Sequence, residues 1–368
     1  MGDRLNLDHA ATTPMVPAAA QALADSFARW ANPSSPHAEG RASRAAIERA
    51  RGRITAAYGW AGECIFTSGA SEAIAIACTR ANADAVLVSA TEHEAVLRAV
   101  PDSERLPVLA DGTLDRAALE AALARTPDRA LVAVQWGNNE TGVLQPLAEI
   151  ARIVHAAGGL LLADAAQMPV GWDDHDLPQD HADFIAISGH KRGGPIGIGA
   201  LLVRDLTTLH PSGGQERGYR GGTENMPGAV AFQAALDTPE DLIYMADLRD
   251  HLDVLIAEAG GDPIASTAER RTPLIGAYRM PGVAAATQLI RFDLAGIAVS
   301  AGAACSSGSM RPSHVLAQMG IAAADAGEVI RVSFGRETGA DDIARFVAAW
   351  REIAGELRAQ PSAPDQRL

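Results

Sequence analysis

The sequence predicts an α/β fold, in which a large domain with a mostly parallel sheet flanked by helices is joined to a smaller α+β domain. Between residues 63 and 203, short apolar runs alternate with helix-like segments, which is typical of a parallel sheet. A glycine-rich stretch over residues 211–225 then ends this alternation. The chain has 368 residues, of which 48% are hydrophobic, so it is long enough to bury two cores.

The expected elements follow from the apolar runs, because frequent alanine blurs the helical periodicity. We expect buried strands at residues 64–68, 85–90, 130–136, 159–166, 183–188 and 199–203. Helices are expected at residues 71–81, 94–99, 114–125, 146–157, 226–259 and 341–358, with further strands near 274–280, 287–293 and 329–334. The large domain is expected to span residues 15–250, and the small domain residues 1–14 together with 251–368.

Charge and cysteine content restrict the function. The net charge is −14, with 45 acidic and 31 basic residues, so direct nucleic-acid binding is not expected. No apolar run is long enough to span a membrane, and the N-terminal residues do not resemble a signal peptide. The three cysteines are widely spaced, which argues against a disulfide framework or a metal site and favours a cytoplasmic protein.

Lys191 is the only lysine of the chain, because the other 30 of its 31 basic residues are arginines. It follows the predicted strand 183–188, and α/β sheets bind their ligands beyond the ends of such strands. Lysine can lose its proton and act as an amine nucleophile, whereas arginine cannot. Lys191 therefore predicts covalent binding of an aldehyde cofactor that carries a phosphate, with Ser188 and His190 as neighbouring donors.

Two other predicted strands end in groups that suit the same cofactor. Asp164 would pair with a protonated pyridine nitrogen, and Gln167 would bind the ring oxygen. Ala70 and Ser71 begin a helix after a strand and a glycine, so their N–H groups can bind a phosphate. The same pattern also describes an ordinary helix start.

Four further residues are candidates for chemistry. His93 and Asn139 follow two more apolar runs, so we expect them at the same edge of the sheet. Cys305 lies among small residues over 300–309, where a thiol would be exposed and mobile enough to act as a nucleophile. Arg331 lies within an apolar strand, and a buried arginine requires a carboxylate, either structural or on a substrate. In contrast, Cys64 and Cys78 are expected to be buried.

Taken together, these motifs resemble the cysteine desulfurases of the NifS/IscS type, in the class V aminotransferase group of fold-type I pyridoxal phosphate enzymes. The resemblance follows the chain in order over nearly its whole length. Its motifs are 7–14 (LDHAATTP), 32–37 (NPSSPH), 67–72 (TSGASE), 92–93 (EH), 138–140 (NNE), 164–167 (DAAQ), 188–191 (SGHK), 213–216 (GGQE), 222–225 (GTEN), the Cys305 segment and 331–336 (RVSFGR).

The resemblance implies a role for each of these residues. Lys191 would bind pyridoxal 5′-phosphate and later move the proton at the substrate Cα, while Cys305 would take the sulfur as a persulfide. His93 would stack on the ring and transfer protons, and Asn32 and Arg331 would bind the substrate. Other residues would bind the cofactor: the ring is contacted by Asp164, Gln167 and Asn139, and the phosphate by Ala70, Ser71, Ser188, His190 and the partner subunit's Thr223.

The implied substrate is L-cysteine, and the implied assembly is a homodimer that delivers sulfur to an acceptor protein for iron–sulfur cluster assembly or thiolation. Selenocysteine lyase and another class V aminotransferase-type activity remain alternatives. An aminotransferase would not require Cys305, whereas a selenocysteine lyase could retain every motif. A non-catalytic binding protein is the third alternative, although it would be expected to have lost Lys191, Asp164 or Cys305, and all three are present.

Overall fold

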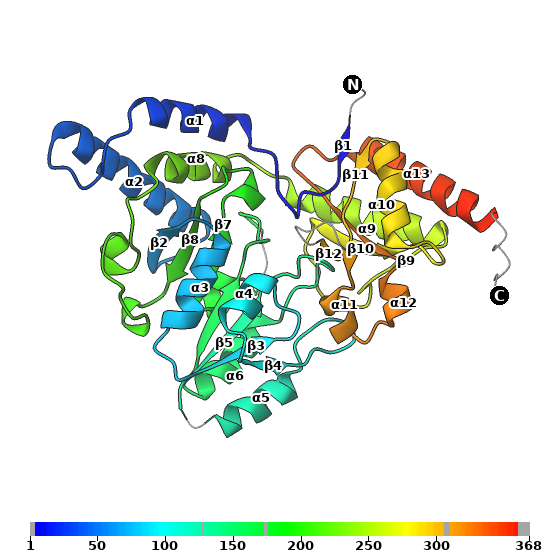
Figure 1. The fold of residues 1–368 in the computed structure, drawn as a ribbon, viewed down its shortest axis with the longest axis horizontal. Coiled ribbons are helices and arrows are strands. Elements are labelled where there is room, and N and C mark those ends of the chain that lie inside the picture. Colours follow the sequence, from blue (N-terminus) through cyan, green and yellow to red (C-terminus); the bar gives the residue numbers. More distant parts are fainter. Residues whose placement is uncertain (1–3, 127, 173–175, 305–309, 360–368) are drawn as a thin grey trace, which may run out of the picture. The chain divides into compact units, whose positions relative to one another are not determined.

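The computed structural model describes residues 4–126, 128–172, 176–304 and 310–359, so Cys305 lies outside the described residues. The chain forms two compact units (Figure 1). We call residues 10–139 and 143–240 the lysine unit, because they contain Lys191. Residues 1–9, 140–142 and 241–368 contain Arg331, and we call them the arginine unit.

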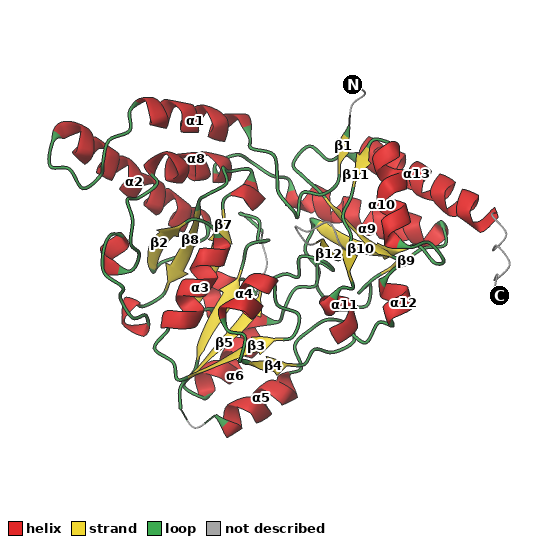
Figure 2. Cartoon of the chain, viewed as in Figure 1, coloured by secondary structure: helices red, strands yellow, loops and turns green. Residues whose placement is uncertain are grey.

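The lysine unit is built on a seven-stranded sheet with the order β2-β8-β7-β6-β5-β3-β4. Figure 2 shows strands in yellow and helices in red. Strands β7, β6, β5, β3 and β4 are parallel, whereas β8 pairs antiparallel with β7 and β2. The strands are β2 (Glu63–Thr67), β3 (Ala85–Ser89), β4 (Glu104–Leu106), β5 (Ala130–Gln135), β6 (Leu160–Asp164), β7 (Phe184–Ser188) and β8 (Gly199–Val203). The predicted mostly parallel sheet is confirmed.

Helices cover both faces of this sheet, because alternate strand residues pack in opposite directions. Ile74 of α3 and Val96 of α4 pack in one cluster, whereas Ile150 of α6 and Phe232 of α8 pack in the other. The helices of this unit are α1 (Pro17–Ala28), α2 (Ala38–Ala57), α3 (Ala70–Arg80), α4 (Glu94–Ala99), α5 (Arg116–Arg125), α6 (Leu147–Ala156), α7 (Pro178–His181) and α8 (Met226–Leu236). Short 3-10 turns lie at His190–Arg192, Leu206–Thr208 and Glu216–Gly218.

The arginine unit has a small antiparallel sheet of order β14-β10-β9, which packs against helices. Its strands are β1 (Leu5–Asn6), β9 (Asp262–Pro263), β10 (Ile275–Arg279), β11 (Ile297–Ala298), β12 (Ala303–Ala304), β13 (Met310–Arg311) and β14 (Val329–Ser333). Its helices are α9 (Leu242–Glu258), α10 (Ala285–Leu294), α11 (His314–Gln318), α12 (Ala323–Ala326) and α13 (Ala340–Ala359). Strand β1 pairs in parallel with β11, so the N-terminal segment is part of this unit.

Two predicted elements are wrong. The strand expected at 287–293 is helix α10, whose buried residues Ala285, Gln288 and Phe292 have helical spacing, while Ile290 is exposed. The single helix expected over 226–259 is two helices, α8 and α9, because the intervening segment 237–241 contains a proline and ends in Asp241, which caps α9. Among the described residues, no helix combines the length and apolar character of a membrane span.

Candidate active site

Lys191 lies in the 3-10 turn that directly follows β7. Its Nζ donates hydrogen bonds to the carbonyl oxygens of Ala10 and Ala11, the latter at 3.0 Å. Thr13 holds the same segment in place, because its N–H donates to the carbonyl of His190 and its hydroxyl donates to the carbonyl of Lys191, both at 3.0 Å. The segment 10–13, which precedes α1, therefore positions the lysine, a role that the sequence did not reveal.

Asp164 is the last residue of β6, and only 7% of its surface is exposed. Burial raises the pKa of its carboxyl, whereas the N–H of Ala166, then His93 and then Lys191 act in the opposite direction. The Ala166 N–H donates to Oδ1 at 3.0 Å. Lys191 and His93, which act electrostatically on Asp164, are thus two of the predicted catalytic residues. Gln167 lies nearby, where its amide donates to the Ala10 carbonyl at 3.0 Å.

A second buried carboxylate, Glu92, lies close to Asp164 and was not predicted as part of the site. Its Oε1 accepts a hydrogen bond from the N–H of Gln135 at 2.8 Å, and Gln135 is the strand partner of Asp164 between β5 and β6. Burial raises the pKa of Glu92 well above its ordinary value, and the negative charge of Asp164 raises it further. Burial and the neighbouring carboxylate thus both favour the neutral, protonated form of Glu92.

Buried polar side chains connect the ends of β3 and β5. The amide of Gln135 donates to the hydroxyl of Thr91 at 3.0 Å, and the amide of Asn138 donates to Oε1 of Gln135 at 3.2 Å. His93 caps α4, because its Nδ1 accepts a hydrogen bond from the N–H of Ala95 at 3.1 Å. These contacts hold the two loops that present His93 and Asn139.

The N-terminus of α3 lies against the end of β7, where the predicted phosphate donors belong to both elements. Gly199 is the strand partner of Ser188, and a Cβ on Gly199 would lie 2.6 Å from the Cα of Gly69. This close approach, which only glycine permits, places the start of α3 with Ala70 and Ser71 beside the end of β7. Burial lowers the pKa of His190, and Lys191 lowers it further, so its imidazole is neutral near pH 7.

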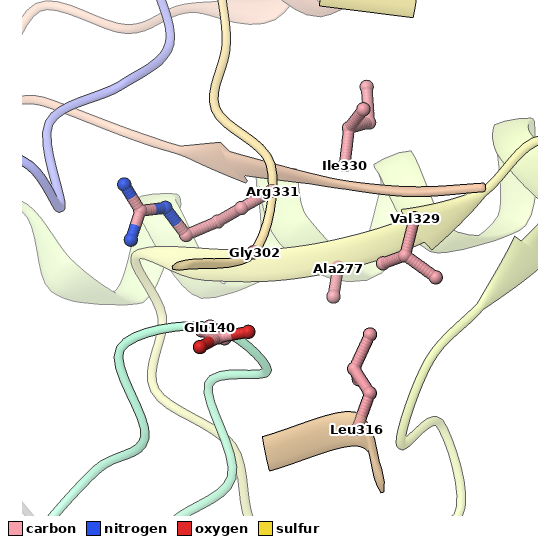
Figure 3. Close-up of a pocket in the computed structure, with 7 residues that line it drawn as sticks. All are labelled: Glu140, Ala277, Gly302, Leu316, Val329, Ile330 and Arg331. Atoms are coloured by element: carbon pink, nitrogen blue, oxygen red, sulfur yellow. The ribbon is translucent and has the colours of Figure 1, made fainter. Parts of the chain in front are cut away.

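In the arginine unit, Arg331 lies in the middle of β14 and its side chain is 9% exposed. Its Nη2 donates to Oδ1 of Asp8 at 2.7 Å. Arg331, Glu140 and Leu316 are among the residues that line a cavity of about 10 Å³. Figure 3 shows the Arg331 side chain extending away from Leu316. The Oε2 of Glu140 accepts a hydrogen bond from the hydroxyl of Ser313 at 2.5 Å.

The structure also shows the burial of two cysteines and the exposure of two further predicted site residues. Cys64 and Cys78 are buried as predicted, and burial raises the pKa of each thiol to about 12, so neither suits a nucleophile. Asn32 and Thr223 are exposed in the single chain, and their roles stay predictions. No group of three or more metal-ligating side chains occurs among the described residues.

The residues present fit pyridoxal phosphate. The buried carboxylate of Asp164 at the end of β6 can pair with a pyridinium nitrogen, and the amine of Lys191 acts electrostatically on the same carboxylate. The N-terminus of α3 and the end of β7 supply N–H and hydroxyl donors for a phosphate. Asp164, Lys191, His93, Ser71, Ser188 and His190 would therefore hold the group.

The mostly parallel sheet and this lysine site define the class of fold-type I enzymes. The aminotransferase class-V family model matches residues 5–346, and the chain belongs to this family. A cysteine desulfurase of Cereibacter sphaeroides is 36% identical, with 97% of each chain covered. An IscS-like cysteine desulfurase of Mycobacterium tuberculosis is also 36% identical, with 92% of this chain and 93% of the relative covered. A NifS-like protein from Rickettsia africae has a structure with a TM-score of 0.86, 29% identity, and coverage of 96% of this chain and all of the other. The predicted family and fold class are confirmed.

Proposed function

We propose that this chain is a pyridoxal phosphate-dependent cysteine desulfurase, which converts L-cysteine to L-alanine and places the sulfur on Cys305. The observation that carries the proposal is the buried carboxylate of Asp164 at the end of β6, with Lys191 in the turn that follows the neighbouring strand β7. The near-full-length similarity to proteins named cysteine desulfurase supports the same reaction.

The side chains of the lysine unit bind the cofactor and move protons. When bound, pyridoxal phosphate supplies an electron-accepting ring that stabilises negative charge at the substrate Cα. Asp164 would hold the ring nitrogen and Lys191 would hold the cofactor's aldehyde carbon, and the amine of Lys191 would take and return the proton at the substrate Cα. The carbonyls of Ala10 and Ala11 hold the Lys191 ammonium whenever the side chain carries a proton.

Arg331 and Cys305 act on the two ends of the substrate. Arg331 binds the α-carboxylate, for which a guanidinium is well suited. The thiolate of Cys305 attacks the substrate sulfur, so that an S–S bond forms while the Cβ–S bond breaks. The electron pair of that bond stays on Cβ, which takes up a proton to become the methyl group of alanine. Cys305 is then a persulfide, from which an acceptor protein removes the terminal sulfur.

The assembly is proposed as a cytoplasmic homodimer in which the partner subunit's Thr223 completes the phosphate site. Thr223 is exposed within the glycine-rich segment that follows β8, so it is available to another chain. Mixing Lys191→Ala chains with Thr223→Ala chains should restore one intact site in each heterodimer. Full activity of a monomer would contradict this arrangement.

The domains at 15–250 and at 1–14 with 251–368 are proposed as the folding units, and limited proteolysis would test them.

The reaction is tested by incubating the purified protein with L-cysteine and measuring L-alanine. Without reductant, the Cys305 peptide should gain about 32 Da, the mass of one sulfur atom, as expected for a persulfide. Cys305→Ser should keep its cofactor but lose alanine production, whereas Cys64→Ser serves as a control because its thiol is buried. Turnover of L-selenocysteine with no turnover of L-cysteine would replace the proposal with the lyase alternative.

A further inference from the structure

Asp8 belongs to a motif, 7–14, from which the proposed reaction uses no side chain. Its Oδ1 accepts the hydrogen bond from Nη2 of Arg331 at 2.7 Å, although the two residues are 323 positions apart in the sequence. The Arg331 side chain is 9% exposed and that of Asp8 is 28% exposed, so the ion pair is largely shielded from water. Charge-assisted bonds of this kind fix the orientation of a guanidinium.

The backbone of the N-terminal segment holds Asp8 in place from two sides. The N–H of Leu7 donates to the carbonyl of Ala298 at 2.8 Å, and the N–H of Ser333 donates to the carbonyl of Leu7 at 2.8 Å. Asp8 itself forms a parallel bridge with Ser333, two residues beyond Arg331 on β14. The carboxylate therefore lies on a fixed backbone rather than on a free terminus.

The backbone of Arg331 is fixed as well. Its N–H donates to the carbonyl of Ser300 at 2.6 Å, the Ser300 N–H donates to its carbonyl at 3.1 Å, and Ala277 of β10 is its partner on the other side. The remaining freedom is in the long side chain, whose rotation has an appreciable entropy. Asp8 restrains the guanidinium end of that side chain.

We propose that Asp8 is a positioning residue for substrate binding, which orients Arg331 toward the α-carboxylate of an amino-acid substrate. This inference rests on the proposed function, in which Arg331 binds that carboxylate. A guanidinium has five N–H donors, so a second carboxylate can bind while Asp8 keeps its bond to Nη2. Asp8 thereby lowers the entropy that the arginine loses when the substrate binds.

The test compares steady-state kinetics of three proteins with L-cysteine. Asp8→Ala should raise KM about tenfold and leave kcat within about twofold, because the restraint acts on binding of the substrate in its ground state. Arg4→Ala is the matched control, since it removes the exposed ion pair between Arg4 and Asp293 in the same N-terminal segment. Its KM should equal that of the wild type. Thermal unfolding of each variant would show that all three proteins are folded.

Two further measurements separate positioning from a general structural role. Asp8→Asn keeps an oxygen acceptor and should recover most of the lost affinity. In an Arg331→Gln background, Asp8→Ala should have no further effect on KM, because the group that it orients is absent.

An Asp8→Ala enzyme with an unchanged or lowered KM would overturn the proposal, since Asp8 would then be neutral or would compete with the substrate. A KM increase that persists in the Arg331→Gln background would also overturn it. If the wild type itself does not turn over L-cysteine, the proposed function fails instead, so the two failures can be distinguished.

Discussion

The sites of the two units treat buried charge in opposite ways. In the arginine unit, Arg331 and Asp8 are opposite charges joined by a hydrogen bond of 2.7 Å. In the lysine unit, the carboxyl groups of Glu92 and Asp164 lie close together, and burial and mutual repulsion raise the pKa of Glu92 well above its ordinary value. Opposite charges fix the direction of a side chain, whereas like charges change its protonation. We infer that the arginine unit is built for orientation and the lysine unit for proton transfer.

The largest effect is expected at Lys191, and it should appear in kcat. Lys191→Arg keeps a cation near Asp164 and the carbonyls of Ala10 and Ala11, but arginine is not an amine nucleophile. We expect alanine production to fall by at least about a thousandfold. The absorbance of the bound cofactor should also change, while the thermal midpoint stays near that of the wild type. Retained turnover would show that the lysine unit supplies charge and not proton transfer.

The next effect tests a buried pair of opposite charges in the lysine unit. Arg51 of α2 binds Glu216 through two hydrogen bonds, of 2.7 and 3.2 Å, and Glu216 also accepts from the N–H of Phe66 at 2.9 Å. Glu216→Ala would leave the Arg51 charge buried without its main partner. We expect a loss of about 3–5 kcal/mol in the free energy of unfolding, measured by urea denaturation.

Glu48 is the control for this pair, because it also contacts Arg51 but its side chain is 44% exposed. Glu48→Ala should change the free energy of unfolding by less than about 1 kcal/mol. Equal losses for the two variants would mean that burial does not determine the strength of these pairs. The two units would then differ in the geometry of their charged groups and not in the energetic effect of burial.

The third effect, at Arg331, should appear in KM. Arg331→Gln removes the guanidinium that binds the substrate carboxylate, and it leaves Asp8 without its partner. We expect KM for L-cysteine to rise about a hundredfold, with a smaller effect on kcat, consistent with the loss of a charged partner in a shielded position. Arg279→Gln, on the neighbouring strand, is the control, because Arg279 pairs with Asp262, Asp325 and Glu328. If Arg331→Gln lowered kcat without changing KM, the arginine unit would not be specialised for binding the substrate.

The lysine unit was the easier unit to predict from sequence. Its functional groups lie at the ends of apolar runs, and a parallel sheet brings those ends to one edge, so the sequence alone groups Lys191, Asp164 and His93. Local pattern does not determine side-chain partners across the sheet. Glu92 contacts Gln135, 43 residues away, through a backbone N–H that has no signal in the sequence.

The arginine unit was harder, because its site combines the middle of one strand with the N-terminal segment. Arg331 was recognisable as a buried cation, but its partner Asp8 is 323 positions away. The motif that contains Asp8 was visible in the sequence, although its contacts were not. The sequence predicts a strand in place of helix α10 because alanine at positions 284–286 hides the helical period, and Leu289 and Ile290 resemble part of an apolar strand.

The smallest effect tests the like-charge pair through the pH dependence of stability. The folded state keeps the proton of Glu92 at pH values where the unfolded chain has released it, since burial raises its pKa from an ordinary value of 4.5. Stability of the wild type therefore falls as pH rises above about 4.5, until the pKa of the folded state is reached. Glu92→Gln has no proton to lose and keeps an oxygen to accept from the Gln135 N–H. Its urea midpoint, measured relative to the wild type, should thus increase from pH 5 to pH 8. Glu120→Gln, at an exposed position on α5, is the control, and its urea midpoint should differ from that of the wild type by the same amount at every pH. A constant or decreasing difference in urea midpoint for Glu92→Gln would mean that Glu92 is ionised in the folded protein.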